Sequence, residues 1–220
     1  MAPAINRRRR AMEVRLDLTE YEKLCAEFSG WRIDPFVRMM EKDRREGRVL
    51  AFVRGLRLSA QLIYAARQAV SSAGLEADWG HLLDVSGNYC SPECDVIIHK
   101  PGSFARWNGT QNAVMDFKFI KCSEALAVIS CKSFTAAVDR QYCQKLRQYV
   151  NRVWLFAECC RPDAVDKLRK KAKQAGYRGF WYLYTWDGRN PISPNQQSWL
   201  DFLKALRSLA SGTSEGGARR

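Results

Sequence analysis

This 220-residue chain has little histidine and no common metal-binding cysteine motif. Few catalytic pairs and metal sites are therefore possible. Only His81 and His99 are present, so a catalytic Cys–His or Ser–His pair has few candidates. Cys90 and Cys94 approach His99 in the sequence, but they lack C-x2-C spacing and a clean second pair, which argues against zinc. Gly55 and Gly87 stand alone, and the chain has no glycine-rich phosphate-binding loop.

An uninterrupted hydrophobic run is also missing. The longest apolar region, Val49 to Val70, contains Arg54, Arg57 and Arg67, so we do not expect it to cross a membrane. The basic run Arg7 to Arg10 is not followed by the apolar stretch of a secretory signal. We therefore expect a cytoplasmic protein whose eight cysteines are reduced thiols rather than a disulfide framework.

Positive charge is abundant. The chain has 36 Lys and Arg against 23 Asp and Glu, a net charge of +13. This balance favours binding to nucleic acid, because cationic side chains release the counterions of a polyanion. A basic protein without any such ligand has the same composition, so that alternative stays open. The length suits one domain with a small N-terminal addition, and the 46% hydrophobic content can form a good core.

Capping and turn signals divide the chain into helices and strands. Thr19 and Glu22 have capping-box spacing, and Asp34-Pro35 has the form of an N-cap followed by proline at the first helical position. We expect residues 1–16 to be irregular, 102–112 to be a loop and 211–220 to be a polar tail. The predicted helices are 19–28, 35–47, 50–71, 136–150, 162–175 and 196–209, and the predicted strands are 82–85, 94–99, 114–120, 125–131, 152–157 and 180–186.

Polar side chains stand at the ends of two strongly apolar strands. Asp95 lies at the start of the strand 94–99, and Lys132 directly follows Val128 to Cys131. A carboxylate and an ammonium that converge at a sheet edge can hold Mg²⁺ and position the attacking water in phosphodiester cleavage. Simpler interpretations are that Asp95 is a turn residue and that Lys132 extends from its strand end into solvent.

The arrangement resembles the PD-(D/E)XK nuclease superfamily over roughly Gly55 to Trp186. The resemblance implies an α/β restriction-endonuclease-like fold, with an αβββαβ core, a central mixed sheet flanked by helices, and extra N-terminal helices. Asp95 would bind the metal, Cys131 would offer its backbone carbonyl to it, and Lys132 would contact the scissile phosphate and the water. The implied cofactor is Mg²⁺, with Mn²⁺ as a substitute. The implied domains are an arm with helices (1–48), the nuclease domain (49–210) and a tail (211–220).

Ser130 stands where most of the superfamily has an acid. Ser130-Cys131-Lys132 resembles a Ser-x-Lys branch, which includes restriction enzymes that cut CCGG-containing sites and which takes its Glu from the following helix. That helix offers Asp139 here, and the helix before the first strand offers no acid. The candidate replacements for the missing carboxylate are Asp139, Glu124 and Glu93.

The resemblance implies a metal-dependent endonuclease that cleaves double-stranded DNA, as a type II restriction or phage-defence enzyme. A homodimer is expected, because cutting both strands normally needs two active sites. Arg140, Lys145 and Arg147 on the helix after the motif could contact phosphates, and Arg7 to Arg10 could track DNA. The alternatives are a catalytically inactive nucleic-acid-binding or assembly subunit on the same fold and a basic protein-interaction domain.

Overall fold

A computed structural model describes residues 2–43, 45–102, 104–106, 117–135, 137–189 and 191–212; the side chains of 2–12, 14–16, 104–106 and 210–212 are not described. The helices are α1 (Ala2–Ile33), α2 (Pro35–Lys42), α3 (Glu46–Val70), α4 (Arg140–Leu146), α5 (Val165–Ala175) and α6 (Gln196–Gly212), with short 3-10 helices at Ser71–Ala73 and Pro162–Ala164. The strands are β1 (Glu76–Leu83), β2 (Cys94–His99), β3 (Phe104–Arg106), β4 (Phe117–Lys121), β5 (Ala125–Thr135), β6 (Val153–Cys160), β7 (Gly179–Thr185) and β8 (Ser193–Pro194).

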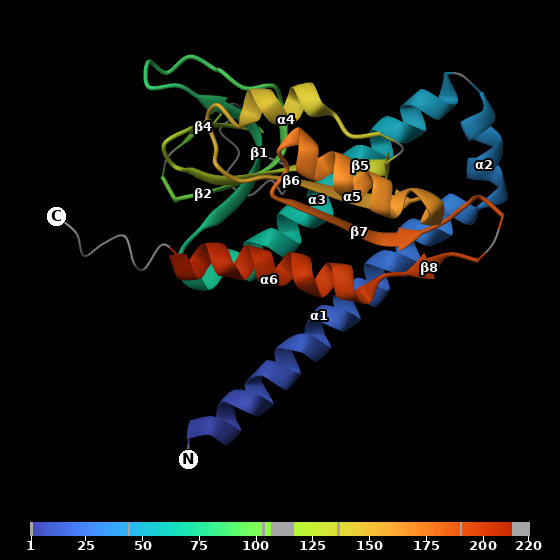
Figure 1. Ribbon diagram of the computed structural model, residues 1–220, viewed down its shortest axis with the longest axis horizontal. Coiled ribbons are helices and arrows are strands. Elements are labelled where there is room, and N and C mark those ends of the chain that lie inside the picture. The colour runs from blue at the N-terminus through green and yellow to red at the C-terminus, as the bar shows by residue number, and fades with distance from the viewer. Residues whose placement is uncertain are drawn as a thin grey trace.

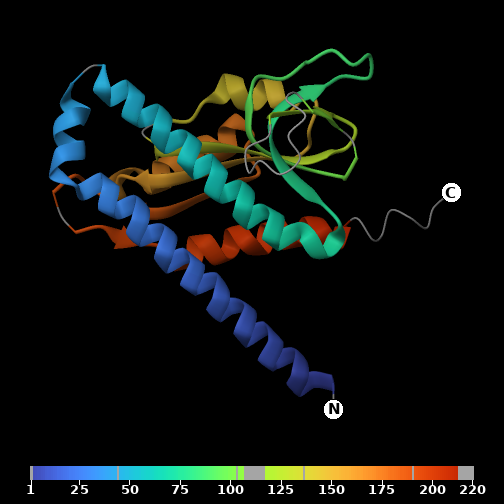
Figure 2. The same cartoon turned by 180° about the vertical axis from the view of Figure 1, so that it is seen from behind.

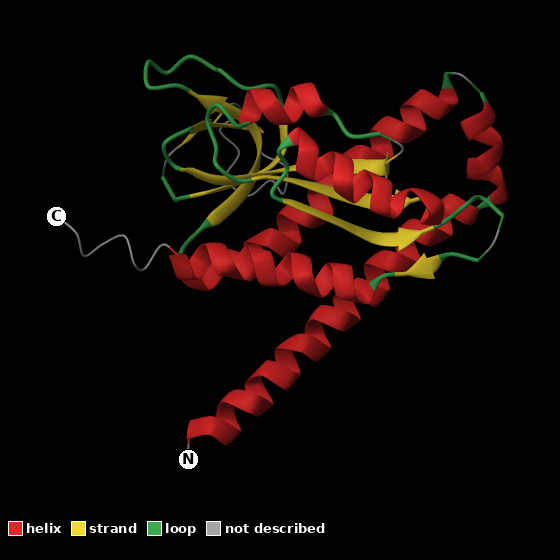
Figure 3. Ribbon diagram, in the orientation of Figure 1, coloured by secondary structure: helices red, strands yellow, loops and turns green. Residues whose placement is uncertain are grey.

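One eight-stranded sheet in the order β3-β4-β1-β2-β5-β6-β7-β8 forms the centre of the molecule. It is mixed: β2 runs antiparallel to β1 and β5, whereas β5, β6 and β7 run parallel to one another. The order α3-β1-β2-β5-α4-β6 is the predicted αβββαβ core, with β3 and β4 inserted between β2 and β5. The predicted fold class, a mixed sheet flanked by helices, is confirmed (Figures 1 and 3).

Helices cover both faces of this sheet. The larger core joins one sheet face to α1, α3 and α6 through residues such as Phe28, Leu62 and Phe202. A second core joins the other face to α4 and α5 through residues such as Leu146 and Ala172. Figure 1 shows α4 and α5 in front of the strands, and Figure 2 shows α1 and α3 from the opposite side. All eight residues of β6 are buried, as expected for a central parallel strand that is covered on both faces.

The α3 helix meets the length and composition test for a membrane span. The span Glu46–Ala73, which includes the following turn, is the one such helix in the described ranges, and 44% of its apolar window is buried in the fold. Its buried face carries Leu58, Leu62 and Ile63 in the larger core. Arg54, which we expected to interrupt a membrane span, is itself buried at 4% exposure.

Several predicted elements are confirmed at their boundaries. The strand 94–99 is β2. Asp34 caps α2, accepting a hydrogen bond from the Val37 amide at 3.0 Å, and Pro35 is the first helical residue. Gly74 and Gly176 adopt left-handed conformations after the α3 region and α5, where a residue without a Cβ is favoured.

Other predictions about elements were wrong. The region 1–16 is not irregular but belongs, from Ala2, to the long helix α1, whose alanine, methionine and arginine residues are good helix formers. The strand predicted at 82–85 begins at Glu76, and the helix predicted at 136–150 is only α4, Arg140–Leu146. The predicted loop contains β3, while positions 1, 44, 103, 107–112, 114–116, 136 and 213–220 of the predicted segments lie outside the described residues.

Candidate active site

The strands β2 and β5 separate at the position of Asp95. Their antiparallel register ends with the pair Val96–Ile129, while β5 continues along β6 as far as Thr135. Beyond that point the Cys131 amide has a side chain as its acceptor: it donates to Asp95 Oδ2 at 2.7 Å. The Asp95 carboxylate is thus fixed at the place where the sheet opens.

Asp95 is an acid under opposing electrostatic influences. Burial raises the pKa of its carboxyl above the ordinary value, and the hydrogen bond from Cys131 and the positive charge of Lys132 oppose that rise only in part. The neighbouring carboxylate of Glu93 raises this pKa further. Asp95 and Lys132, from two different strands, therefore lie within electrostatic range of each other, with Glu93 as a second acid nearby.

The first turn of α4 covers this region. The Tyr142 hydroxyl donates to the Glu93 carbonyl oxygen at 3.0 Å, and Lys132 Nζ lies 5.9 Å from the centre of the Tyr142 ring, a cation–π contact. Asp139 serves instead as the N-cap of α4, and its Oδ1 accepts from the Tyr142 amide at 2.9 Å. Glu93, rather than Asp139, is the acid whose charge affects Asp95.

Ser130 lies inside the protein. Its side chain is fully buried at 0% exposure, and its Oγ makes no hydrogen bond of normal geometry within the described ranges. The neighbouring Tyr177 hydroxyl donates instead to the Asp139 carbonyl oxygen at 3.0 Å. A buried hydroxyl without a charge is a poor ligand for a hard cation, so the position of the expected acid offers little to a metal.

Glu124 lies at the other end of β5. Its carboxylate forms an ion pair with Lys100 at 3.2 Å, and the adjacent Ala125 pairs with His99 at the far end of β2. Six residues of extended chain separate Glu124 from Ser130, which corresponds to about 20 Å. The structure therefore does not bring Glu124 to Asp95.

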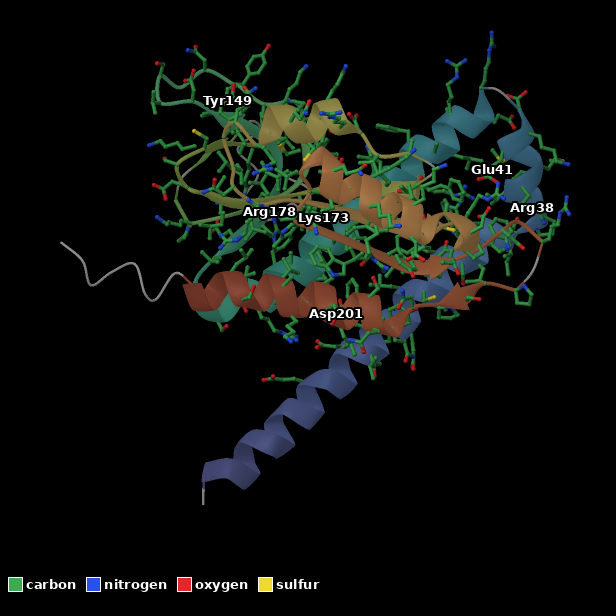
Figure 4. The ribbon with its side chains drawn as sticks, viewed as in Figure 1. Arg38, Glu41, Tyr149, Lys173, Arg178 and Asp201 are labelled. Atoms are coloured by element: carbon green, nitrogen blue, oxygen red, sulfur yellow. The ribbon has the colours of Figure 1, made fainter. Side chains whose placement is uncertain are left out.

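Arg140, Lys145 and Arg147 are all exposed on or just after α4. Arg147 also lines a hollow of about 440 Å³ whose other cationic residues are Arg169, Lys173 and Arg178. Figure 4 labels two of these residues, Lys173 and Arg178. Arg178 carries no signal in the sequence, because its neighbours along the chain include no other cation and no helical pattern.

A second group of ionisable residues lies at the start of β1. Single ligand atoms of Glu76, Asp78 and His99 lie within 4.8 Å of one another, so this group could hold a metal ion. Two cations already occupy Asp78, however: Lys118 Nζ donates to Oδ2 at 2.7 Å and Arg67 to Oδ1 at 2.5 Å. Burial acts to raise the pKa of Asp78, but the hydrogen bonds from His99 and Lys118 outweigh it, so the pKa is lowered.

No protein-family model and no curated protein sequence matches the chain. Among solved structures, NucC from P. aeruginosa ATCC27853 in its cAAA-bound form superposes with a TM-score of 0.56 at 12% identity, over 89% of this chain and 90% of that one. NucC from E. coli MS115-1, also cAAA-bound, gives a TM-score of 0.55 at 11% identity, over 90% and 89% of the two chains. At such identities the likeness shows the fold, and activity has to be argued from the site.

Proposed function

We propose that this protein is a metal-dependent endonuclease that cleaves DNA in a restriction or phage-defence role, with Asp95 and Lys132 at its active site. One observation carries the proposal: a half-buried carboxylate and an ammonium from adjacent strands lie within electrostatic range of each other where β2 and β5 separate. The fold shared with NucC supports assignment to the PD-(D/E)XK superfamily.

The residues around Asp95 fit Mg²⁺, or Mn²⁺ in its place. Hard cations take oxygen ligands, and Cys131 engages only one of the two Asp95 carboxylate oxygens. The Asp95 carboxylate, the Cys131 carbonyl and the Glu93 carboxylate would hold the ion. We propose Glu93 as the second acid in place of Asp139, because the charge of Glu93 acts on Asp95, whereas Asp139 caps α4. Such an ion, when bound, polarises a phosphate and lowers the pKa of its water.

The cationic residues supply the remaining roles. Lys132 would donate to an oxygen of the scissile phosphate and orient the attacking water. Val128 and Lys132 pair with Val153 and Ala157 of β6, a separation of four residues or about 13 Å. Since Arg178 bonds through its amide to the Val153 carbonyl oxygen, the hollow that it lines with Arg147 lies roughly that far along the strands. A duplex backbone could therefore contact both places.

Plasmid cleavage tests the proposal. DNA should be nicked or linearised with Mg²⁺ or Mn²⁺ and protected by EDTA, and Asp95→Asn and Lys132→Ala should each lose cleavage while remaining folded. Glu93→Gln should reduce cleavage strongly, because the metal loses a charged ligand. Glu124→Gln is the matched control and should cleave normally, since that carboxylate is remote from Asp95. Robust cutting by both the Asp95 and Lys132 variants would reject this site.

The burial of Ser130 favours one alternative, a catalytically inactive DNA-binding or assembly subunit on the same fold. In that case the wild type should bind DNA without cleaving duplex, single-stranded or RNA substrates. Calorimetry should then detect no Mg²⁺ binding that depends on Asp95. The expected homodimer, with two sites for the two strands, is tested by sedimentation of the full chain with and without DNA.

A further inference from the structure

An aromatic pocket lies on β1 and β4. Five residues line it and all carry rings: Trp79, His81, Tyr89, Phe117 and Phe119, around a volume of about 470 Å³. The parallel register pairs Trp79 with Phe117 and His81 with Phe119, so side chains of alternate residues meet on one face of the sheet. The volume is within the usual range for small-ligand sites, about 300–1,000 Å³.

The rings that line this aromatic pocket also contact one another. Trp79 and Phe117 meet edge to face, with centroids 5.1 Å apart and planes at 81°, and His81 meets Phe117 in a similar way at 5.3 Å. An edge-to-face pair covers the face of only one of its two rings, whereas His81 and Phe119 lie nearly parallel, with centroids 6.1 Å apart and planes at 20°. The ring surface open to a ligand is therefore mainly that of Tyr89. Tyr89 closes the pocket with 71% of its surface exposed. No aliphatic side chain of the described residues lines it, so the pocket suits a planar aromatic ligand better than an aliphatic one.

The aromatic pocket is joined to the candidate active site by direct contacts. Trp79 Nε1 donates to Glu93 Oε1 at 2.8 Å, and the Glu93 carbonyl oxygen accepts from the Tyr142 hydroxyl. Lys132 Nζ makes a cation–π contact with the Tyr142 ring. The charge of Glu93 in turn affects Asp95. A nucleic-acid strand with one phosphate at Lys132 would therefore have a neighbouring nucleotide close to the pocket.

We propose that the aromatic pocket binds an unpaired nucleobase of the strand held at Asp95 and Lys132; the inference rests on the function proposed above. Aromatic rings stack on bases of any sequence, because every base has a π-face. His81 adds a polar contact. Its Nδ1 lies 3.0 Å from the Ser91 carbonyl oxygen, and since a carbonyl only accepts, Nδ1 carries a proton; in the tautomer with only that proton, Nε2 is an acceptor for a base N–H.

Binding to two oligonucleotides that differ only in their bases tests this inference. The probes are a thymidine decamer and an abasic decamer with the same backbone, measured in EDTA so that no cleavage occurs. The wild type should prefer the thymidine decamer. Tyr89→Ala should weaken binding to that decamer about fivefold or more, the lower end of base–aromatic stacking, and leave the abasic decamer unaffected. The salt dependence should not change, because stacking releases no counterions.

Two further variants control the experiment. Tyr89→Phe keeps the ring and should keep the preference for the thymidine decamer. Tyr64→Ala removes another exposed tyrosine, on α3 at 52% exposure, and should behave as wild type. Since Tyr89 is largely exposed, Tyr89→Ala should unfold at the wild-type temperature, which separates lost stacking from lost folding.

An unchanged preference for the thymidine decamer in Tyr89→Ala would overturn the inference. If that variant instead altered self-association in sedimentation and kept the wild-type preference, the pocket would be a protein interface and the inference would again fail. A wild type that cleaves DNA but binds both decamers equally would reject the nucleobase pocket alone. A wild type that binds neither decamer and no duplex would reject the proposed function itself.

Discussion

The buried ion pair between Arg32 and Glu158 should decide how firmly α1 is held to the sheet. Arg32 is 5% exposed and Glu158 0%. Arg32 Nε and Nη2 donate to Glu158 Oε1 at 3.1 and 2.9 Å, and Arg32 Nη2 also donates to the Ser133 carbonyl oxygen at 2.9 Å. The Tyr184 hydroxyl donates to the same carboxylate oxygen. Arg32→Ala would leave a carboxylate buried in the core without its cation.

Removing one partner of a buried ion pair destabilises a protein by about 3–5 kcal/mol. For a domain of this size that corresponds to a fall in Tm of about 6–20 °C. Burial raises the pKa of Glu158 above its ordinary 4.5, so the folded state holds this proton more tightly than the unfolded state does. The contribution of Glu158 to stability is therefore fully present below the pKa of the unfolded state, and it is lost as pH rises through the higher pKa of the folded state. Without Arg32 this pKa rises further, so Arg32→Ala should be more destabilised at pH 7 than at pH 5.

Urea unfolding at both pH values measures the effect. The control is Asp163→Asn, which breaks an exposed pair with Arg161 whose Nε and Oδ1 are 3.2 Å apart and should cost less than about 1 kcal/mol. Replacing both buried partners, Arg32→Met with Glu158→Leu, should recover much of the stability, because no charge is left in the core. The reasoning is refuted if Arg32→Ala costs no more than the control, or if its cost is the same at the two pH values.

Two further predictions address packing and DNA binding. Gly80→Ala should destabilise the fold by about 1–3 kcal/mol or more, because a Cβ there would collide with the Lys118 backbone carbonyl; Gly55→Ala, with open space in α3, is the control and should unfold no more easily than wild type. Replacing Lys173 and Arg178 by alanine should reduce the slope of log affinity against log salt for duplex DNA by about 2, if each contacts one phosphate. A slope equal to that of Lys204→Ala, an exposed lysine of α6, would mean that the hollow does not bind DNA.

The sequence predicted those elements whose boundaries are set by local chemistry. The strand β2 is an apolar run that ends before Pro101-Gly102, and α2 starts at an Asp-Pro pair, so neighbouring residues alone define both. The strand β1 was detected only at its end. Its first half carries Asp78, which looks like a surface residue in the sequence but is buried in the sheet because Arg67 and Lys118, from distant segments, neutralise it. Such long-range pairing is invisible to hydrophobic periodicity.

The residues of the proposed site carry local signals of the same kind, but only in part. Asp95 and Lys132 each end or begin an apolar run, which is a local signal, and pairing of the two strands places them within electrostatic range of each other. Glu93 precedes the regular strand and looks like a solvated turn residue. Its proximity to Asp95 arises where β2 leaves β5, and no pattern within residues 92–98 reports that separation. The aromatic pocket joins positions about 38 residues apart, so it too becomes visible only in three dimensions.

The choice of second acid follows from what each carboxylate already does. Asp139 Oδ1 satisfies an amide at the first turn of α4, a contact worth about 0.5–2 kcal/mol to the helix. Glu93 accepts a hydrogen bond from an indole and already raises the pKa of Asp95 by its charge. Two carboxylates that repel each other in this way gain most from a divalent cation between them, because the cation removes the repulsion that the burial of Asp95 strengthens. The electrostatic conflict at Asp95 is therefore an argument for metal binding at this position, and it favours Glu93 over Asp139 as the second acid of the proposed site.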